Sequence, residues 1–256
     1  GALERSGVQP TDIDYVVLGQ VLQAGSGQNA ARQAAIAGGL GMAIPALTIN
    51  KVCLSGIDAI ALADQMIRAG EFDAVVAGGM ESMSQAPHLL IGSREGKKYG
   101  DWTMIDALAF DGLTCAFDEC AMGEATERYN DRYALTRQEQ DAVAEASHRR
   151  AAAAQSVGIL AEEITPVRIP QRKGDDIVVT DDEGIRAETT AESLGRLRPA
   201  FAPEGTITAG NASQISDGAA ALVVTSRAAA ERLERTPMAF LGSMGVWMFW
   251  ACIISV

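Results

Sequence analysis

The sequence has 256 residues, 48% of them hydrophobic, and its 21 Lys and Arg against 33 Asp and Glu give a formal net charge of −12. This length fits one large domain or two modest ones, and the apolar share is too high for a disordered chain. Because the pI is near 4.6, the chain offers no general attraction to nucleic-acid phosphates. We therefore expect no nucleic-acid partner, and an anionic substrate would have to be met by local donors.

The two ends of the chain and its cysteines indicate the cellular compartment in which we expect the protein. Residues 1–7 look like the last turn of a helix that starts before the chain does, and they lack the basic and apolar parts of a secretory signal. The four cysteines show no C-x-x-C pairing, which is typical of a reducing compartment, so we expect a cytoplasmic protein. Residues 246–256 read VWMFWACIISV, an uncharged run too short to span a bilayer, so we expect no membrane partner.

Apolar runs and Ala-rich stretches alternate along the first third of the chain. The runs typical of buried strands are residues 15–18, 44–49, 74–77 and, much later, 219–225. Helical stretches at 29–40 and 56–69 separate the first three, and each is followed by Gly. This alternation predicts an α/β fold with a mainly parallel sheet.

The alternation is interrupted between residues 84 and 214. The interruption holds a Gly-rich loop at 92–100, two helices, and an acidic stretch punctuated by prolines at 166–203. The first helix, 119–133, carries one amphipathic face, made by Met122, Ala125, Thr126, Tyr129 and Tyr133. The second helix opens at Thr136, whose spacing to Glu139 predicts a capping box, and extends to about residue 156.

These patterns predict three parts of the chain. An α/β domain comprises residues 1–83 and 215–236, and an inserted loop domain comprises residues 84–214. A linker near Thr236 and Pro237 leads into residues 237–256, which are the start of a further domain or an aberrant apolar tail.

Residues 25–30, Gly-Ser-Gly-Gln-Asn-Ala, fit the dinucleotide pattern G-x-G-x-x-A between a strand and a helix. That site also needs an acidic residue about 20 positions further on. No Asp or Glu occurs between Asp14 and Asp58, so we interpret the motif as a tight Gly turn. Close packing rather than phosphate binding is also expected of three other glycines, Gly78, Gly79 and Gly210.

Cys53 lies at the junction between the strand that ends near Ile49 and the helix that starts near Ser55. A cysteine at a helix N-terminus faces unsatisfied N–H groups, which favour the thiolate. The carboxyl edge of a parallel sheet is also where α/β proteins bind ligands. The alternative is a small buried cysteine that fills space, and spacing alone does not separate the two.

The other candidate groups favour structural roles. His88 ends a Gln-Ala-Pro-His turn, and His148 sits on a charged helix beside two arginines, so we expect loop and surface roles for both. Cys115 and Cys120 lack the usual spacing of zinc ligands, so we expect no metal site.

Several segments resemble the thiolases, the family of acetyl-CoA acetyltransferases and 3-ketoacyl-CoA thiolases. They are residues 50–88 (beginning NKVCLSGIDAIALADQMIRAG), 197–224 (LRPAFAPEGTITAGNASQISDGAAALVV), 28–40 (QNAARQAAIAGGL) and the Ala-Met-Gly of 121–123. The similarity extends in order from about Leu3 to about Met244. It implies a layered α/β/α domain with a long inserted loop domain, and a second α/β domain that is essentially missing from this sequence.

The resemblance implies that Cys53 is the nucleophile that takes an acyl group from a thioester. In the family, the acyl-enzyme either condenses with the enolate of acetyl-CoA or arises by cleavage of a 3-ketoacyl-CoA. Coenzyme A and acetyl-CoA are then substrates, and no permanently bound cofactor is expected. The backbone N–H of Cys53 would hold part of the oxyanion.

The family's contacts to coenzyme A carry over to eight positions. The resemblance places Leu113 and Met122 on the pantetheine channel, Arg186 and Ser193 near the nucleotide, and four residues along the pantetheine arm: Phe201, Ala209, Ser213 and Ile215. Without the resemblance, a solvated loop charge explains Arg186 equally well. Ala121 stands where some acetoacetyl-specific members carry His, which weakens the case for acetoacetyl-CoA as the preferred substrate.

Three family motifs do not occur in the sequence: a His in Gly-His-Pro, a second Cys flanked by glycines, and an Asn in Asn-Glu-Ala-Phe. One hypothesis is therefore a truncated piece of a thiolase that is inactive alone. The other is a non-catalytic protein on the same half-fold that binds acyl-CoA or forms an oligomer interface. Family members are homodimers or homotetramers, and residues 44–49 are the interface element that the resemblance suggests.

Overall fold

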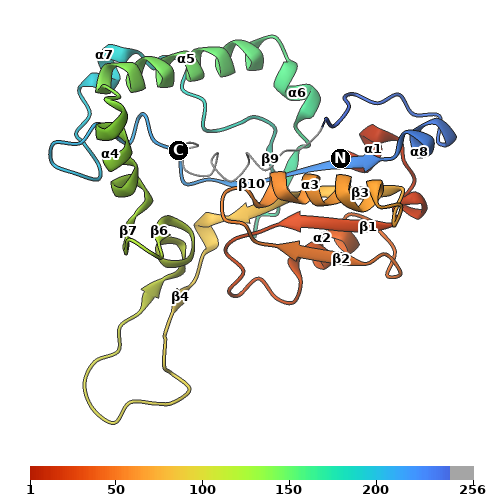
Figure 1. The fold of residues 1–256 in the computed structure, drawn as a ribbon, viewed down its shortest axis with the longest axis horizontal. Coiled ribbons are helices and arrows are strands. Elements are labelled where there is room, and N and C mark those ends of the chain that lie inside the picture. Colours follow the sequence, from red (N-terminus) through yellow and green to blue (C-terminus); the bar gives the residue numbers. More distant parts are fainter. Residues whose placement is uncertain (243–256) are drawn as a thin grey trace. The chain divides into compact units, whose positions relative to one another are not determined.

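The structure, a computed structural model, describes residues 1–242 (Figure 1). Its helices are α1 (Ala2–Ser6), α2 (Ala30–Ala37), α3 (Ser55–Arg68), α4 (Met122–Tyr133), α5 (Arg137–Ser156), α6 (Ile159–Glu163), α7 (Ala191–Gly195) and α8 (Arg227–Arg232). Its strands are β1 (Tyr15–Gly19), β2 (Ala46–Ile49), β3 (Ala74–Ser82), β4 (His88–Leu89), β5 (Ile105–Asp106), β6 (Thr114–Cys115), β7 (Cys120–Ala121), β8 (Val167–Ile169), β9 (Ile177–Val179) and β10 (Asp217–Thr225). A π-helical turn spans Leu108–Leu113.

The main sheet has the strand order β10-β3-β1-β2. Strand β1 pairs in parallel with both β2 and β3, whereas β10 is antiparallel to β3. The prediction of a mainly parallel sheet is therefore confirmed. Because Asp217 pairs with Ser82, the start of β10 lies at the edge where the parallel strands end. This carboxyl edge is where ligands bind in open α/β sheets.

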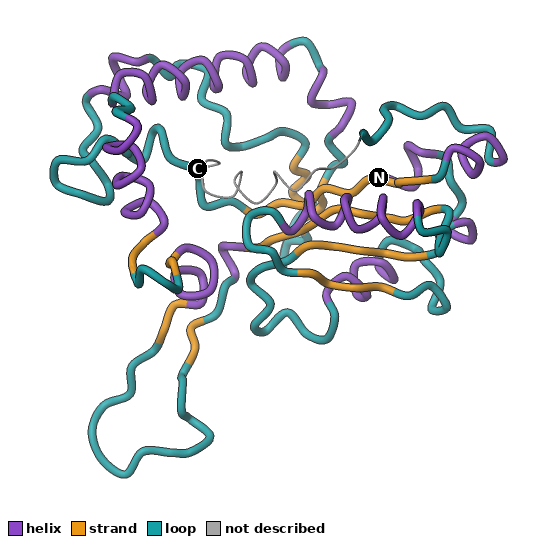
Figure 2. The backbone as a smooth tube through the Cα atoms, in the orientation of Figure 1, coloured by secondary structure: helices purple, strands orange, loops and turns teal. Residues whose placement is uncertain are grey.

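Strand β1 is buried between two helices because its side chains point alternately to the two faces of the sheet. Val16 and Leu18 join the apolar cluster that includes Ala31 and Ala35 of α2. Val17 joins the second cluster, formed with small residues of α3 and β3. Figure 2 shows the strands with a helix on each face. The predicted α/β/α layering is thus present in this part of the chain.

The chain divides into two compact units. Among the described residues, the first unit comprises Gly1–Thr114 and residues 215–242, and the second comprises residues 115–214. The strand and helix alternation ends near residue 84, as the sequence indicates, but residues 84–114 pack with the first unit. They contain the short β4 and β5 ladder, whose pairing of Leu89 with Ile105 closes the loop between these strands.

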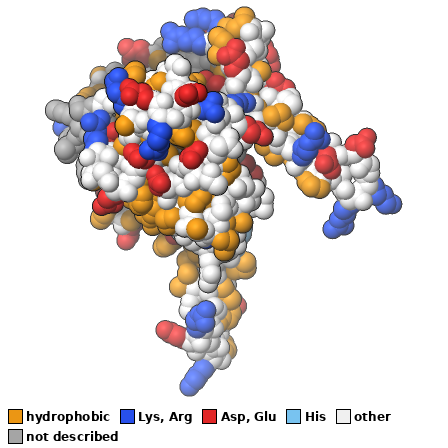
Figure 3. All heavy atoms as spheres, turned by 90° about the vertical axis from the view of Figure 1, so that its right-hand side faces the viewer, with side chains coloured by type: hydrophobic (Ala, Val, Ile, Leu, Met, Phe, Trp, Pro, Cys, Tyr) orange, Lys and Arg blue, Asp and Glu red, His pale blue; other side chains and the backbone are white. Residues whose placement is uncertain are grey.

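That loop, residues 90–104, contains the predicted Gly-rich stretch. Its Arg94, Lys97 and Lys98 are exposed, and Figure 3 shows Lys and Arg side chains at the end of the lowest projection. They are local positive charges in a chain that is acidic overall.

The second unit is built around α5, which packs against α6 and α7. Thr136 and Glu139 form the predicted capping box at the start of α5. Helix α4 begins at Met122 rather than near residue 119, because Cys120 and Ala121 form strand β7.

None of the helices within residues 1–242 is long and apolar enough to cross a membrane. The apolar run Val246–Val256 and most of the predicted segment 237–256 lie outside the described residues.

Candidate active site

Cys53 lies in the short loop between β2 and α3, two residues before the helix starts at Ser55. The predicted helix start at Ser55 is confirmed. The side chain of Cys53 is exposed, so the alternative of a buried, space-filling cysteine is wrong. That this position before a helix N-terminus favours the thiolate stays a prediction.

The backbone before Cys53 is strained and held in place. Val52 has a φ of 51°, an unusual value for a β-branched residue. The Asn50 side chain accepts a hydrogen bond from the Val52 N–H at 2.9 Å. The Ser55 hydroxyl accepts from the Lys51 N–H at 2.8 Å and donates to the Val52 carbonyl at 2.6 Å. These contacts therefore fix the backbone conformation from which the Cys53 side chain projects.

A salt bridge joins the same turn to the first turn of α3. Lys51 Nζ lies 2.6 Å from the Asp58 carboxylate, and both side chains are about a third exposed. An exposed pair of this kind contributes little stability by itself. Its effect here is local, because it joins Lys51, two residues before Cys53, to the helix that follows Cys53.

Glycines let α3 approach the sheet closely. A Cβ on Gly19, the last residue of β1, would lie 2.5 Å from the Ser55 carbonyl carbon. A Cβ on Gly79 would lie 3.3 Å from the Gly56 Cα, and one on Gly78 would lie 2.0 Å from the Ala220 carbonyl oxygen. Close packing, the predicted role of Gly78 and Gly79, is thus confirmed. The contacts of Gly19 and Gly79 hold the N-terminus of α3 at the carboxyl edge of the sheet.

Two of the predicted contacts to coenzyme A belong to the same unit as Cys53. Leu113 ends the π-helical turn, in which Gly112 packs near Leu22, three residues beyond the end of β1. Ile215 precedes β10 by two residues and is 64% exposed. Both therefore lie at the same edge of the sheet as residues 50–55, which we call the Cys53 turn.

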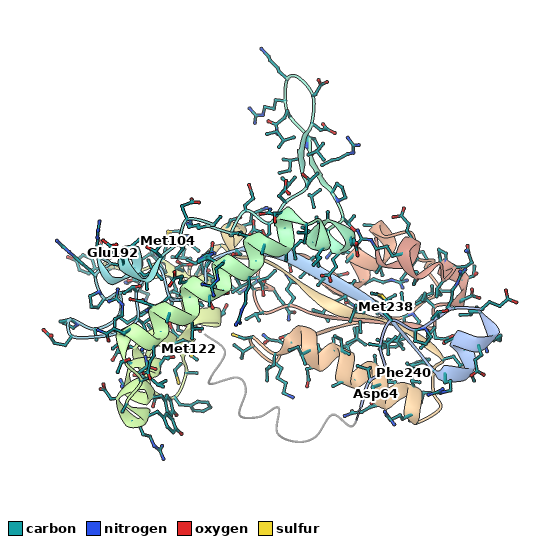
Figure 4. All side chains as sticks on the ribbon, turned by 90° about the horizontal axis from the view of Figure 1, so that it is seen from above. Asp64, Met104, Met122, Glu192, Met238 and Phe240 are labelled. Atoms are coloured by element: carbon teal, nitrogen blue, oxygen red, sulfur yellow. The ribbon has the colours of Figure 1, made fainter. Side chains whose placement is uncertain are left out.

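The other predicted contacts belong to the second unit. Met122 lies in the first turn of α4 (Figure 4). Next to it, Gly123 leaves room for Phe201, because a Cβ there would lie 2.3 Å from the Phe201 ring. The structure thus brings Phe201 onto the first turn of α4.

Ser193, Arg186, Ala209 and Ser213 lie elsewhere in the second unit. The Ser193 hydroxyl already donates to the Thr190 carbonyl, inside the capping box of α7. The Arg186 N–H donates to Nδ1 of His148 at 3.2 Å, and the Arg186 side chain is exposed. His148 therefore has a structural partner that the sequence did not indicate. Ala209 and Ser213 are exposed.

The buried face of α4 differs from the predicted apolar face. Tyr129 is 37% exposed and Tyr133 is 58% exposed, whereas the buried residues are Gly123, Glu127 and Asn130. The apolar pattern is misleading because the buried face of α4, which carries Glu127 and Asn130, packs against a loop through hydrogen bonds. A signal was present in Glu127 and Asn130, two polar residues whose spacing of three places them on one helical face.

The motif at 25–30 is a closed turn, as predicted. Gly25 and Gly27 have φ values of 80° and 86°, and Asn29 caps α2 by accepting from the Arg32 N–H. The Gln33 side chain fills the loop by donating to two of its carbonyls. The loop therefore turns these carbonyl acceptors toward Gln33.

Within residues 1–242, no group of three or more His, Cys, Asp and Glu side chains could hold a metal ion. Cys120 is buried, and the Cys115 sulfur accepts from the Asp118 N–H at 3.4 Å.

The chain matches a known protein family and a solved structure of the same fold. The family model described as "Thiolase, N-terminal domain" matches residues 1–228. The chain belongs to the thiolase family. A similar solved structure is the acetyl-CoA acetyltransferase of Bacillus anthracis, with a TM-score of 0.87 and 38% identity over 92% of this chain and 59% of that one. The thiolase resemblance predicted from the sequence is confirmed.

Two curated thiolase relatives show how much of such a protein is covered. A "Probable acetyl-CoA acetyltransferase" of Mycolicibacterium smegmatis is 61% identical over 96% of this chain and 63% of its own length. An "Acetyl-CoA acetyltransferase" of Thiocystis violacea is 54% identical over 93% of this chain and 61% of its own length. The chain thus spans less than two thirds of the relatives it matches.

Proposed function

We propose that this thiolase chain takes an acetyl group from acetyl-CoA onto Cys53, as the first half of an acyl-CoA:acetyl-CoA acyltransferase reaction. The observation that carries the proposal is the exposed Cys53 on a strained turn at the N-terminus of α3. The names of the relatives, acetyl-CoA acetyltransferases, support the substrate class. The overall reaction would form or cleave acetoacetyl-CoA or another 3-ketoacyl-CoA.

The proposed step is a thioester exchange. The Cys53 sulfur attacks the acetyl carbonyl, a new carbon–sulfur bond forms, and the bond to the coenzyme A sulfur breaks. The proton of Cys53 goes to the departing sulfur, which leaves as free coenzyme A. Because the two thiols have similar basicity, neither direction is strongly favoured.

The Cys53 turn would stabilise the tetrahedral intermediate. The backbone N–H groups at the start of a helix point out of its N-terminus and face developing negative charge. We propose that the Cys53 N–H, just before the helix, donates to the acyl oxygen as well.

We propose pantetheine contacts from Leu113, Met122, Phe201, Ala209, Ser213 and Ile215, and nucleotide contacts from Arg186 and Ser193. The arginine would supply local positive charge to a phosphate or a cation for the adenine face.

Release of coenzyme A tests the proposal. On mixing with a large excess of acetyl-CoA, the 256-residue chain is expected to release about one equivalent of coenzyme A thiol, as expected for a single covalent acyl-enzyme. Cys53→Ala is expected to release none, and Cys115→Ala serves as the matched cysteine control. Equal release by the chain and by Cys53→Ala would refute Cys53 as the acyl acceptor.

The second candidate is a non-catalytic thiolase-like protein that binds acyl-CoA or forms an oligomer interface. The observation in its favour is that the two histidines, His88 and His148, both lie outside a Gly-His-Pro context. Acetyl-CoA binding without release of coenzyme A would favour this candidate.

A further inference from the structure

A buried carboxylate on α4 holds the loop that follows α7. Glu127 is 8% exposed, and its two oxygens accept from the Thr206 N–H at 2.8 and 3.0 Å. It also accepts from the Ile207 N–H at 2.7 Å and from the Thr206 hydroxyl at 2.9 Å. No ion pair involves Glu127 in the described part of the chain. Its charge is therefore compensated by the main chain of the loop.

The other contacts of Glu127 leave little room for another arrangement. A Cβ on Gly205 would lie 2.4 Å from a Glu127 oxygen, so the loop passes directly over the carboxylate. Asn130, one turn further along α4, donates to the Thr206 hydroxyl at 3.1 Å. Phe201 meets the same helix at Gly123, one turn before Glu127. Three successive turns of α4 thus hold one loop.

A second buried carboxylate holds the other end of the loop. Asp141 of α5 is 3% exposed and accepts from the Asn211 side chain at 2.9 Å. Asn211 in turn accepts from the Thr208 N–H at 2.7 Å and donates to the Thr206 carbonyl at 3.1 Å. The backbone from Thr206 to Asn211 is therefore fixed by buried polar groups from two helices.

Three side chains of the same segment are exposed. Phe201 is 39% exposed, and Ala209 and Ser213 are exposed, although the backbone between them is tied down. A loop that is anchored by buried charges and presents exposed side chains is pre-organised for a ligand. These three side chains are among those proposed above to follow the pantetheine arm.

We infer that Glu127 is a positioning residue for coenzyme A, because its carboxylate holds the loop of residues 197–213 in the conformation that binds pantetheine. The inference rests on the proposed function, since it needs Phe201, Ala209 and Ser213 to contact the ligand. Glu127 itself touches neither the ligand nor Cys53.

Burial raises the pKa of Glu127, but the hydrogen bonds from the N–H groups of Thr206 and Ile207 outweigh it, and the pKa lies below its ordinary value of 4.5. The carboxylate is therefore charged at neutral pH and accepts four hydrogen bonds from three donors. A glutamine has one acceptor oxygen and adds an NH₂ group that would face N–H donors.

The test compares how coenzyme A release depends on acetyl-CoA concentration in the 256-residue chain and in Glu127→Gln. If the substitution leaves the loop in the binding conformation about a tenth of the time, the half-saturating acetyl-CoA concentration rises about tenfold. The limiting rate is expected to stay within about twofold, because the Cys53 turn is unchanged. S-acetyl-N-acetylcysteamine, which lacks the nucleotide and most of the pantetheine arm, is expected to react equally with both proteins.

Two further variants provide a milder substitution and a matched control. Thr206→Val removes the hydroxyl but keeps the backbone hydrogen bonds to Glu127, and we expect a smaller rise in the half-saturating concentration, about threefold. Glu124→Gln is the matched control on the same helix, since Glu124 is an exposed partner of Arg128. It is expected to leave both kinetic parameters unchanged. If Glu127→Gln fails to fold, Thr206→Val decides the question.

The outcomes separate the inference from the proposed function. An unchanged half-saturating concentration in the folded variants overturns the role of Glu127 and leaves the acetylation of Cys53 standing. A parallel loss of reactivity toward the short thioester also overturns it, because the damage would then extend to the Cys53 turn. No release of coenzyme A by the unsubstituted chain removes the proposed function, and the inference with it.

Discussion

At the scale of single residues, the Cys53 turn depends on a few backbone positions that admit little variation. Val52 holds a φ of 51°, and Gly19 faces the backbone of Ser55 with no room for a side chain. The sequence indicates the position of Cys53 before a helix, because strand and helix patterns meet there. It does not indicate the strain at Val52 or the approach at Gly19, because both arise from packing between distant segments.

Gly19→Ala tests the close approach of α3. The new methyl would lie 2.5 Å from the Ser55 carbonyl carbon, so the helix start must shift. We expect the free energy of unfolding to fall by about 1–3 kcal/mol and acetylation of Cys53 to slow. Gly41→Ala is the control, because nothing lies within 4 Å of its Cβ position. Urea unfolding measures both, and equal stabilities would contradict the packing argument.

Ser55→Ala tests the hydrogen bonds of the turn. The substitution removes the acceptor of the Lys51 N–H and the donor to the Val52 carbonyl, at a buried position. We expect a loss of about 1–3 kcal/mol in unfolding free energy and slower alkylation of Cys53 by iodoacetamide. An unchanged alkylation rate would show that the turn does not depend on this hydroxyl.

At the scale of elements, patterns that arise within one segment are the predictable ones. The capping box at Thr136 and the three parallel strands follow from local sequence and are present. The buried face of α4 could not be predicted in this way, because Glu127 and Asn130 form hydrogen bonds with residues about 80 positions away. Hydropathy cannot reveal a polar face whose partners lie in a distant loop.

Thr136→Ala measures how much the capping box contributes to the free energy of unfolding. The hydroxyl accepts from the Glu139 N–H at 3.2 Å, and the Glu139 carboxylate accepts from the Thr136 N–H at 2.9 Å. We expect the free energy of unfolding to fall by about 1 kcal/mol. Thr103→Ala, at an exposed loop position, is the control. Chemical unfolding that fails to distinguish the two variants would argue that the cap contributes nothing to stability.

At the scale of the whole molecule, acid stability follows from carboxylates held by hydrogen bonds. The pKa of Glu127 is lowered as described, and hydrogen bonds from the Ser84 hydroxyl and N–H lower the pKa of Asp217 below 3.8. A carboxylate whose folded pKa lies below its unfolded value stabilises the fold above the unfolded pKa, and this stability is lost as the pH falls through the folded pKa. We therefore expect thermal stability to be level above about pH 5 and to fall below it. Glu127→Gln should flatten this fall, and an identical pH profile would contradict the assignment.

Turnover is also a property of the whole molecule. The chain covers 61% of the Thiocystis violacea relative, and its sequence contains no Gly-His-Pro motif. Since removal of acid and base groups costs several orders of magnitude, we expect the 256-residue chain to thiolyse acetoacetyl-CoA at least about 10³-fold more slowly than that relative. Comparable turnover that disappears in Cys53→Ala would refute this expectation. The oligomeric state and the cytoplasmic location stay predictions.

The central claim, that Cys53 accepts the acetyl group, is tested most directly by peptide mapping. The chain is incubated with acetyl-CoA, quenched in acid, digested, and sequenced by tandem mass spectrometry. The account predicts an acetyl thioester on the Cys53 peptide and none on the peptides of Cys115 and Cys120. An acetyl group on another residue, or an unmodified Cys53 that also resists iodoacetamide, would contradict it.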